Sequence, residues 1–84
     1  MTKSIIVADL YGKYKNPIAE LVAEAGKFDA CRINLISGSR TINAKSFLGV
    51  LALEPSEGMA VDIMVEGPDA ETALNAMEVY LTCK

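Results

Sequence analysis

Four short segments of the chain carry the β-branched residues or the apolar–polar alternation that are typical of strands. They span residues 2–8, 31–35, 40–43 and 59–66. Ser37-Gly38-Ser39 lies between the second and third segments and predicts a hairpin turn. A hairpin joins antiparallel strands, so the four strands cannot all be parallel.

Two longer segments repeat apolar residues at every third or fourth position, as amphipathic helices do. Asn16 and Pro17 predict the start of the first helix, as N-cap and first helical residue, and Gly26 predicts a left-handed stop. The second helix begins after Gly67-Pro68-Asp69. The apolar face of the first helix is formed by Ile18, Leu21, Val22 and Ala25. That of the second is formed by Ala70, Ala73, Leu74, Met77 and Leu81.

A shorter third helix is predicted after Ser46 and runs to about residue 53. Serine is a favoured N-cap because its hydroxyl accepts a hydrogen bond from a free N–H of the first turn. The helix is rich in apolar residues and contains Gly49. A helix this short is unstable alone, so it must pack on an apolar surface. Residues 10–15, before the first helix, are predicted to form a loop in which Gly12 permits a turn.

The predicted order of elements is β-α-β-β-α-β-α. Amphipathic helices need an apolar surface, and one face of an antiparallel sheet provides it. The expected fold class is therefore α+β: an open-faced β-sandwich, in which a four-stranded antiparallel sheet carries three helices on one face. The length of 84 residues is that of one domain, which is predicted to span residues 1–84.

The absence of histidine restricts the chemistry most. It excludes histidine-based acid–base catalysis, metal ligation and phosphotransfer. Cys31 and Cys83 have no CxxC spacing and are interpreted as reduced thiols. The carboxylates show no pairing pattern for acid–base work. We therefore expect no enzyme activity, no metal and no cofactor.

Charge and hydropathy restrict the partners. The net charge of −3 argues against general affinity for nucleic acid. No apolar run is long enough to span a bilayer, and no signal peptide precedes the first strand. We expect a cytoplasmic protein with no direct nucleic-acid or membrane partner.

Three stretches of the sequence resemble HPr, the phosphocarrier of the bacterial phosphoenolpyruvate-dependent sugar phosphotransferase system. They are the segment Asn43-Ala44-Lys45-Ser46-Phe47-Leu48-Gly49-Val50, the loop from Gly12 to Pro17, and the ending from Gly67 to Glu78. The resemblance covers nearly the whole chain and implies the same open-faced sandwich. It also implies two sites, because HPr is phosphorylated on a histidine and, in Gram-positive-type bacteria, on a serine.

The histidine site departs from the family pattern, which reads Gly-Ile/Leu-His-Ala-Arg-Pro-Ala. The resemblance places the histidine position on Tyr14 and the arginine position on Asn16. A tyrosine phosphate is a much poorer phosphoryl donor, and Asn16 supplies no charge. Lys13 and Lys15 replace part of that charge, but as point charges rather than as a bidentate fork. Tyr14 is either an alternative phosphoacceptor or a surface aromatic in a repurposed loop, and the second interpretation is favoured.

The serine site keeps the family pattern. In the family, a kinase/phosphorylase modifies the serine that matches Ser46, and the product assists a repressor of catabolic genes. A phosphate there would add charge beside an apolar group that can dock partners, formed by Phe47, Leu48 and Leu51. The alternative is that Ser46 only caps the helix, that the apolar residues only fill the core, and that Lys45 is only solvated.

The leading hypothesis is an HPr-like regulatory or interaction protein that lacks phosphocarrier activity and is regulated by phosphorylation at Ser46. Its expected partners are HPr kinase/phosphorylase, a transcriptional regulator, and enzyme I or IIA-type components. The residues predicted to bind them are Lys13, Tyr14, Lys15, Lys45, Phe47, Leu48 and Leu51. Two alternatives stay open: a divergent phosphocarrier that still exchanges phosphate with enzyme I, and a docking module that works without phosphorylation.

Overall fold

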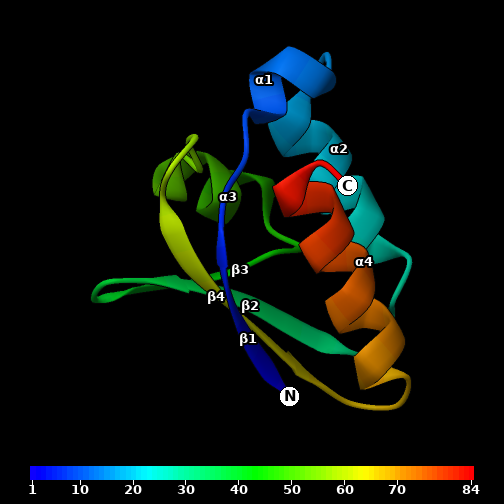
Figure 1. Ribbon diagram of the computed structural model, residues 1–84. Helices are drawn as coiled ribbons and strands as arrows, with labels where there is room; N and C mark the ends of the chain where they lie inside the picture. Colours follow the sequence, from blue (N-terminus) through cyan, green and yellow to red (C-terminus); the bar gives the residue numbers. More distant parts are fainter.

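Four strands form a single antiparallel sheet in the computed structural model, which describes all residues from Met1 to Lys84 (Figure 1). The strands are β1 (Thr2–Ile6), β2 (Arg32–Ser37), β3 (Arg40–Asn43) and β4 (Ala60–Glu66). Their order across the sheet is β1-β4-β2-β3, and every neighbouring pair is antiparallel. The predicted four-stranded antiparallel sheet is confirmed.

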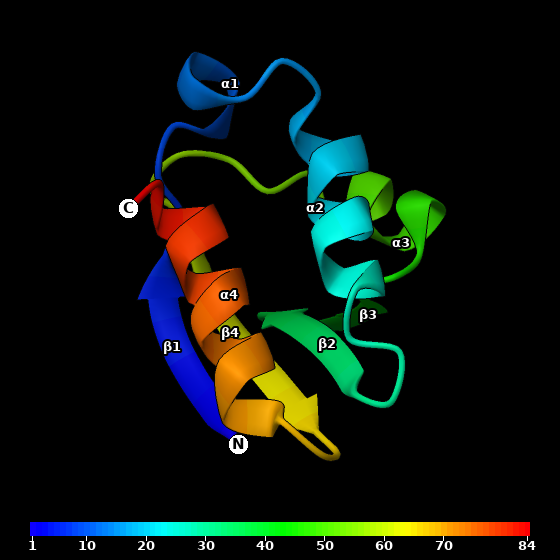
Figure 2. The same ribbon diagram turned by 90° about the vertical axis from the view of Figure 1, so that its right-hand side faces the viewer.

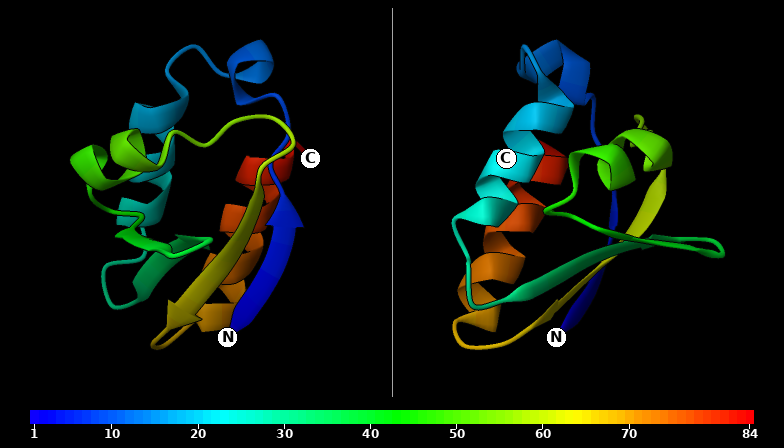
Figure 3. Two further views of the ribbon diagram at one scale, coloured as in Figure 1. Left: turned by 90° about the vertical axis from the view of Figure 1, so that its left-hand side faces the viewer. Right: turned by 180° about the vertical axis from the view of Figure 1, so that it is seen from behind.

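The helices are α1 (Leu10–Lys13), α2 (Pro17–Gly26), α3 (Phe47–Leu53) and α4 (Ala70–Thr82). Figures 1 and 2 show α2 and α4 side by side on one face of the sheet, with α3 next to α2. The left view in Figure 3 looks onto the other face, which no helix covers. The α+β open-faced sandwich is therefore confirmed.

The core lies between the sheet and the helices. Its buried side chains are apolar, although that of Tyr80 also carries a hydroxyl group. Cross-strand neighbours on the core face include Ile5 with Val61 and Leu35 with Ile63. The α4 face is the predicted one, except that Tyr80 is also buried and Ala70 is only partly so. No buried side-chain nitrogen or oxygen lacks a hydrogen-bond partner.

The prediction of a loop at residues 10–15 is wrong for its first part, where the chain forms the one-turn helix α1. Asp9 is the cause, because its Oδ1 accepts a hydrogen bond from Gly12 N–H at 3.1 Å and so acts as the N-cap. β1 also ends at Ile6 rather than at Ala8, although Val7 still donates to Met59 O.

The predicted left-handed stop at Gly26 is also wrong. Gly26 is the last residue of α2 and has no positive φ, and Lys27 after it is right-handed. Turn hydrogen bonds from Lys27 N–H to Glu24 O and from Phe28 N–H to Ala25 O satisfy two carbonyls of the last turn of α2. The chain therefore leaves this helix without a left-handed residue.

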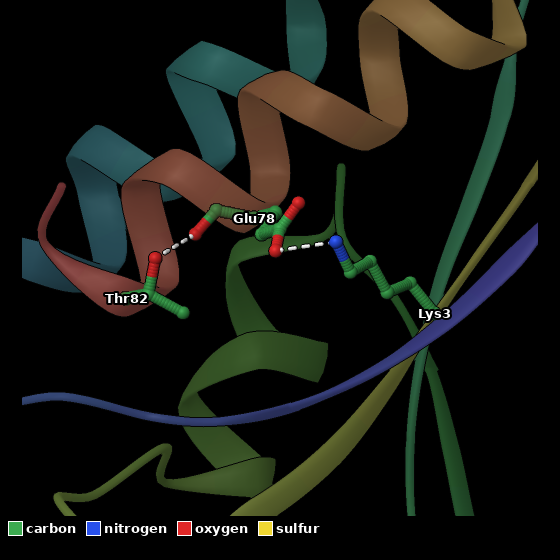
Figure 4. A network of polar contacts seen from close by, with 3 residues as sticks. All are labelled: Lys3, Glu78 and Thr82. Carbon is green, nitrogen blue, oxygen red and sulfur yellow. Dashed lines mark hydrogen bonds and ion pairs between the residues drawn. The ribbon is translucent and has the colours of Figure 1, made fainter.

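One ion pair joins the edge strand β1 to α4. Lys3 Nζ lies 2.7 Å from Glu78 Oε2, and Thr82 Oγ1 donates to the backbone oxygen of Glu78 at 2.6 Å (Figure 4). The hydrogen bond from Lys3, together with its charge, lowers the pKa of Glu78 below its ordinary value. The pair therefore stabilises the contact between β1 and α4 only while Glu78 is ionised.

We predict that replacing Lys3 with methionine weakens the loss of stability in acid. A carboxyl group whose pKa is lowered by folding contributes its stability above its unfolded pKa, and loses it as the pH falls through the folded value. Urea unfolding between pH 6 and pH 2 should therefore show a shallower pH dependence for Lys3→Met than for the parent. Equal slopes would mean that the ion pair contributes nothing in solution.

A second prediction concerns Gly67, which has φ +123° and where an added Cβ would lie 2.7 Å from Ala30 O. Backbone strain and the clash together should make Gly67→Ala less stable by about 2–4 kcal/mol. Gly26→Ala is the matched control, because that position is helical and open, so a gain of about 0.5 kcal/mol is expected. Urea unfolding measures both, and a harmless Gly67→Ala would contradict the close approach.

Candidate functional site

Tyr14, at the predicted phosphoacceptor position, is half-buried between α1 and α2. Its ring stacks on that of Tyr80 from α4, with centroids 4.1 Å apart and planes 6° from parallel. Its hydroxyl donates to Tyr80 O at 3.1 Å, and the Tyr80 hydroxyl donates to Pro17 O at 2.6 Å. Tyr14 is thus neither a plain surface aromatic nor a free hydroxyl, since it joins the loop to the end of α4.

Both phenols of this pair favour their neutral form. Burial raises the pKa of Tyr14, and the nearby Cys83, Glu20 and Glu24 raise it further, because their ionised forms oppose a tyrosinate. Burial also raises the pKa of Tyr80 strongly. A neutral hydroxyl that already donates a hydrogen bond is a poor nucleophile. The arrangement therefore disfavours phosphoryl transfer to Tyr14.

The start of α2 is occupied by a carboxylate from the same helix. Asn16 is the N-cap residue, but its side chain makes no capping bond; its backbone N–H instead donates to Glu20 Oε2 at 2.8 Å. Helix N-termini attract anions through such N–H groups. Here an internal anion occupies that N–H, and Asn16 brings no positive charge.

Lys13, the last residue of α1, and Lys15 lie on the surface near the start of α2. Lys13 Nζ is 3.4 Å from the backbone oxygen of Lys84 and 5.7 Å from the centroid of the Tyr14 ring. Lys15 is exposed and makes no hydrogen bond or ion pair. The structure therefore brings Lys13, Tyr14 and Lys15 together at one end of the molecule, beside the chain terminus.

Ser46 caps α3 as predicted. Its Oγ accepts a hydrogen bond from Gly49 N–H at 3.1 Å and donates none, and the residue is half-buried. Lys45, by contrast, is not simply solvated. Its ammonium donates to the backbone oxygens of Phe28 and Cys31 at 2.7 and 2.6 Å, so the charge is engaged within the chain.

An exposed apolar surface lies on α3, as predicted. The exposed fractions are 48% for Phe47, 74% for Leu48 and 45% for Leu51, whereas Val50 and Leu53 point into the core. The alternative in which all these residues fill the core is therefore wrong.

Sequence reasoning missed two residues that line clefts beside this surface. Tyr11 of α1, with 67% of its surface exposed, and Ile18 of α2 line two shallow clefts of about 220 and 300 Å³. The first cleft also contains Phe47 and the second Leu51. Ile18 packs partly against the core, as the pattern of its helix predicts, and nothing in the sequence places Tyr11 near Phe47 and Leu51.

Other kinds of site are poorly supported. No group of three or more Cys, Asp or Glu side chains comes together to hold a metal ion. Both cysteines are free, and buried Cys31 donates its thiol to Pro68 O. None of the helices has the length and apolar character needed to cross a bilayer.

Comparison with known proteins assigns the chain to a family. Residues 1–82 match the family described as the PTS HPr component phosphorylation site. The chain belongs to the HPr family. HPr of Treponema pallidum is 36% identical over 78 residues, which are 93% of this chain and 88% of that protein.

Two solved structures place the fold of this HPr-family chain in context. HPr from Bacillus anthracis superimposes with a TM-score of 0.88 at 34% identity, over 98% of this chain and 96% of that one. Crh of Bacillus subtilis, described as a catabolite repression protein that forms a domain-swapped dimer, gives a TM-score of 0.72 at 27% identity, over 92% and 83% of the two chains.

A third prediction tests the Tyr14 contact in this HPr-family chain. Tyr14→Phe keeps the stacked ring but removes the hydroxyl donor to Tyr80 O, which then keeps only its 3.3 Å bond from Cys83 N–H, so unfolding should cost about 1 kcal/mol less. The parent should also lose stability as the pH rises above 10, because a phenol with a raised pKa stabilises the fold only while it is protonated.

Tyr11→Phe is the control for this prediction, since Tyr11 is exposed and makes no hydrogen bond. Urea unfolding between pH 8 and pH 11 should separate the two variants, with the smaller alkaline loss in Tyr14→Phe. Identical curves for both variants would show that the Tyr14 hydroxyl is free in solution.

Proposed function

We propose that this chain is a regulatory or interaction member of the HPr family, without histidine phosphocarrier activity and controlled by phosphorylation at Ser46. The observation that carries the proposal is the state of Tyr14: the chain has no histidine, and the hydroxyl at the family's phosphoacceptor position is bonded to Tyr80 O. In this role the chain carries out no catalytic step and acts on protein partners in the cytoplasm.

The loop lacks the groups that a phosphocarrier needs, and this supports the proposal. A carrier needs a nucleophile that accepts and releases phosphate, and positive groups that stabilise the anion between transfers. Tyr14 offers a neutral, bonded phenol. The first N–H at the start of α2 faces Glu20, whose charge would repel a phosphate. Lys13 and Lys15 are the only cations in the loop.

Ser46 meets the requirements of a regulated residue more closely. Its hydroxyl proton is not engaged, and its oxygen lies against the first turn of α3. A phosphate at a helix start is compatible with the helix, because its oxygens can accept from the same N–H groups. Modification would therefore change the surface charge beside Phe47 and Leu48 without unfolding α3.

The exposed surface formed by Tyr11, Phe47, Leu48 and Leu51 is the proposed docking surface for those partners. Apolar side chains gathered around shallow clefts are typical of protein-binding sites. Candidate partners are an HPr kinase/phosphorylase, a transcriptional regulator, and enzyme I or IIA-type components. The structural likeness to Crh, a catabolite repression protein, supports a regulatory partner as one of these candidates.

The fourth prediction is that an HPr kinase/phosphorylase with ATP adds one phosphate to the chain. Intact-mass spectrometry should show this phosphate on the parent and on Ser56→Ala, but not on Ser46→Ala. Ser56 is a suitable control because it is an exposed serine in the loop after α3. An unmodified parent would remove the regulatory proposal and leave a docking module that works without phosphorylation.

Intact-mass spectrometry after a second incubation tests the alternative of a divergent phosphocarrier. Phosphoenolpyruvate and enzyme I should leave the chain unmodified, while a histidine-bearing HPr in the same tube becomes phosphorylated. Phosphate on Tyr14, identified by peptide mapping, would overturn the assignment of the loop.

A further inference from the structure

We propose that Lys45 is a positioning residue that fixes the backbone turn carrying Ser46, an inference that rests on the function proposed for that serine. The Lys45 ammonium donates to Phe28 O at 2.7 Å and to Cys31 O at 2.6 Å, and lies 3.4 Å from Asp29 O. A lysine ammonium has three N–H donors. The three carbonyls therefore account for all of them.

These carbonyls belong to the connection between α2 and β2. The connection follows the C-terminal end of α2, where the helix dipole leaves partial negative charge and favours a cation. Lys27 is nearer in sequence, but its ammonium pairs with Glu24 at 2.9 Å instead. Lys45 thus supplies the positive group that this connection needs, from the other side of the β2–β3 hairpin.

The turn before α3 is bonded on its other side to the sheet. Ala44 is fully buried, and its N–H donates to Ile33 O of β2 at 2.9 Å. Within the turn, Asn43 Oδ1 accepts from Lys45 N–H at 2.8 Å, and Asn43 O accepts from Ser46 N–H at 3.0 Å. Ala44 and Lys45 therefore attach adjacent residues of the turn to two different parts of the fold.

This double attachment determines where Ser46 lies. The Ser46 oxygen must approach Gly49 N–H closely, and an added Cβ at Gly49 would lie only 3.3 Å from that oxygen. Without the Lys45 contacts the turn keeps only its attachment to β2, and the capping bond should open more often. Lys45 then acts on Ser46 through the backbone rather than by touching a partner.

The test compares Lys45→Met, which removes the ammonium at similar side-chain length, with Lys45→Arg and Lys27→Met. Amide hydrogen exchange of Gly49, taken relative to amides of β2 and β4, should become about tenfold faster in Lys45→Met. Lys45→Arg keeps the cation and should fall between the parent and Lys45→Met. Lys27→Met, a surface cation at the same end of α2, should leave the ratio unchanged.

Phosphorylation kinetics supply the second measurement, with an HPr kinase/phosphorylase and ATP. Misplacing the serine should lower kcat about tenfold in Lys45→Met and leave KM nearly unchanged. A raised KM at unchanged kcat would instead make Lys45 a kinase contact and overturn the proposal. The proposal is also overturned if Gly49 in Lys45→Met exchanges at the same relative rate as in the parent. It is overturned as well if Gly49 exchanges as fast in Lys45→Arg as in Lys45→Met.

Hydrogen exchange and phosphorylation kinetics together distinguish the role of Lys45 from the function proposed for Ser46. If the parent is not phosphorylated at all, the function proposed for Ser46 fails, whereas the exchange ratio still decides whether Lys45 fixes the turn. If the parent is phosphorylated but the ratio and kcat are unaffected by Lys45→Met, only the role of Lys45 fails.

Discussion

The packing of α4 across the sheet is the interaction on which the rest of the molecule depends. Its inner face supplies Ala73, Met77 and Leu81, each fully buried, to the single core. Its outer edge is joined to β1 through Glu78. Its last turn carries Tyr80, which contacts both the loop at Tyr14 and the start of α2. One helix therefore completes the core and also sets the shape of the loop at Tyr14.

That coupling makes the loop a structural element of the fold. Burying an aromatic pair at the end of α4 gains apolar contact and stacking energy. The hydroxyl of Tyr14 must then find an acceptor, because an unpaired polar atom in such a place is costly. The backbone carbonyl of Tyr80, in the last turn of α4, is that acceptor, and it also accepts from Cys83 N–H at 3.3 Å. The Tyr14 hydroxyl and the Asn16 N–H at the start of α2 are thus both hydrogen-bonded within the chain.

Sequence reasoning predicted most of the fold because the strands and longer helices carry strong period-two and period-3.6 patterns. The one-turn helix α1 escaped it, because four residues are too few for a period and Asp9 resembles a simple strand breaker. In the site, Ser46 could be predicted from local capping chemistry. The Tyr14–Tyr80 stack and the carbonyl contacts of Lys45 could not, since each joins residues that are distant in sequence.

The loop at Tyr14 and the turn at Ser46 have separate supports, so a substitution in one need not disturb the other. The loop at Tyr14 is supported by Tyr80 of α4 and by Glu20 of α2. The turn at Ser46 is supported by Ile33 of β2 and by the connection after α2, through Ala44 and Lys45. No hydrogen bond is shared between these two sets. Substitutions at positions 14 and 16 therefore change the loop directly but reach Ser46 only through the common core, which is close-packed and resists small displacements. The fold thus allows an HPr-family chain without histidine to present a capped serine beside an exposed apolar surface.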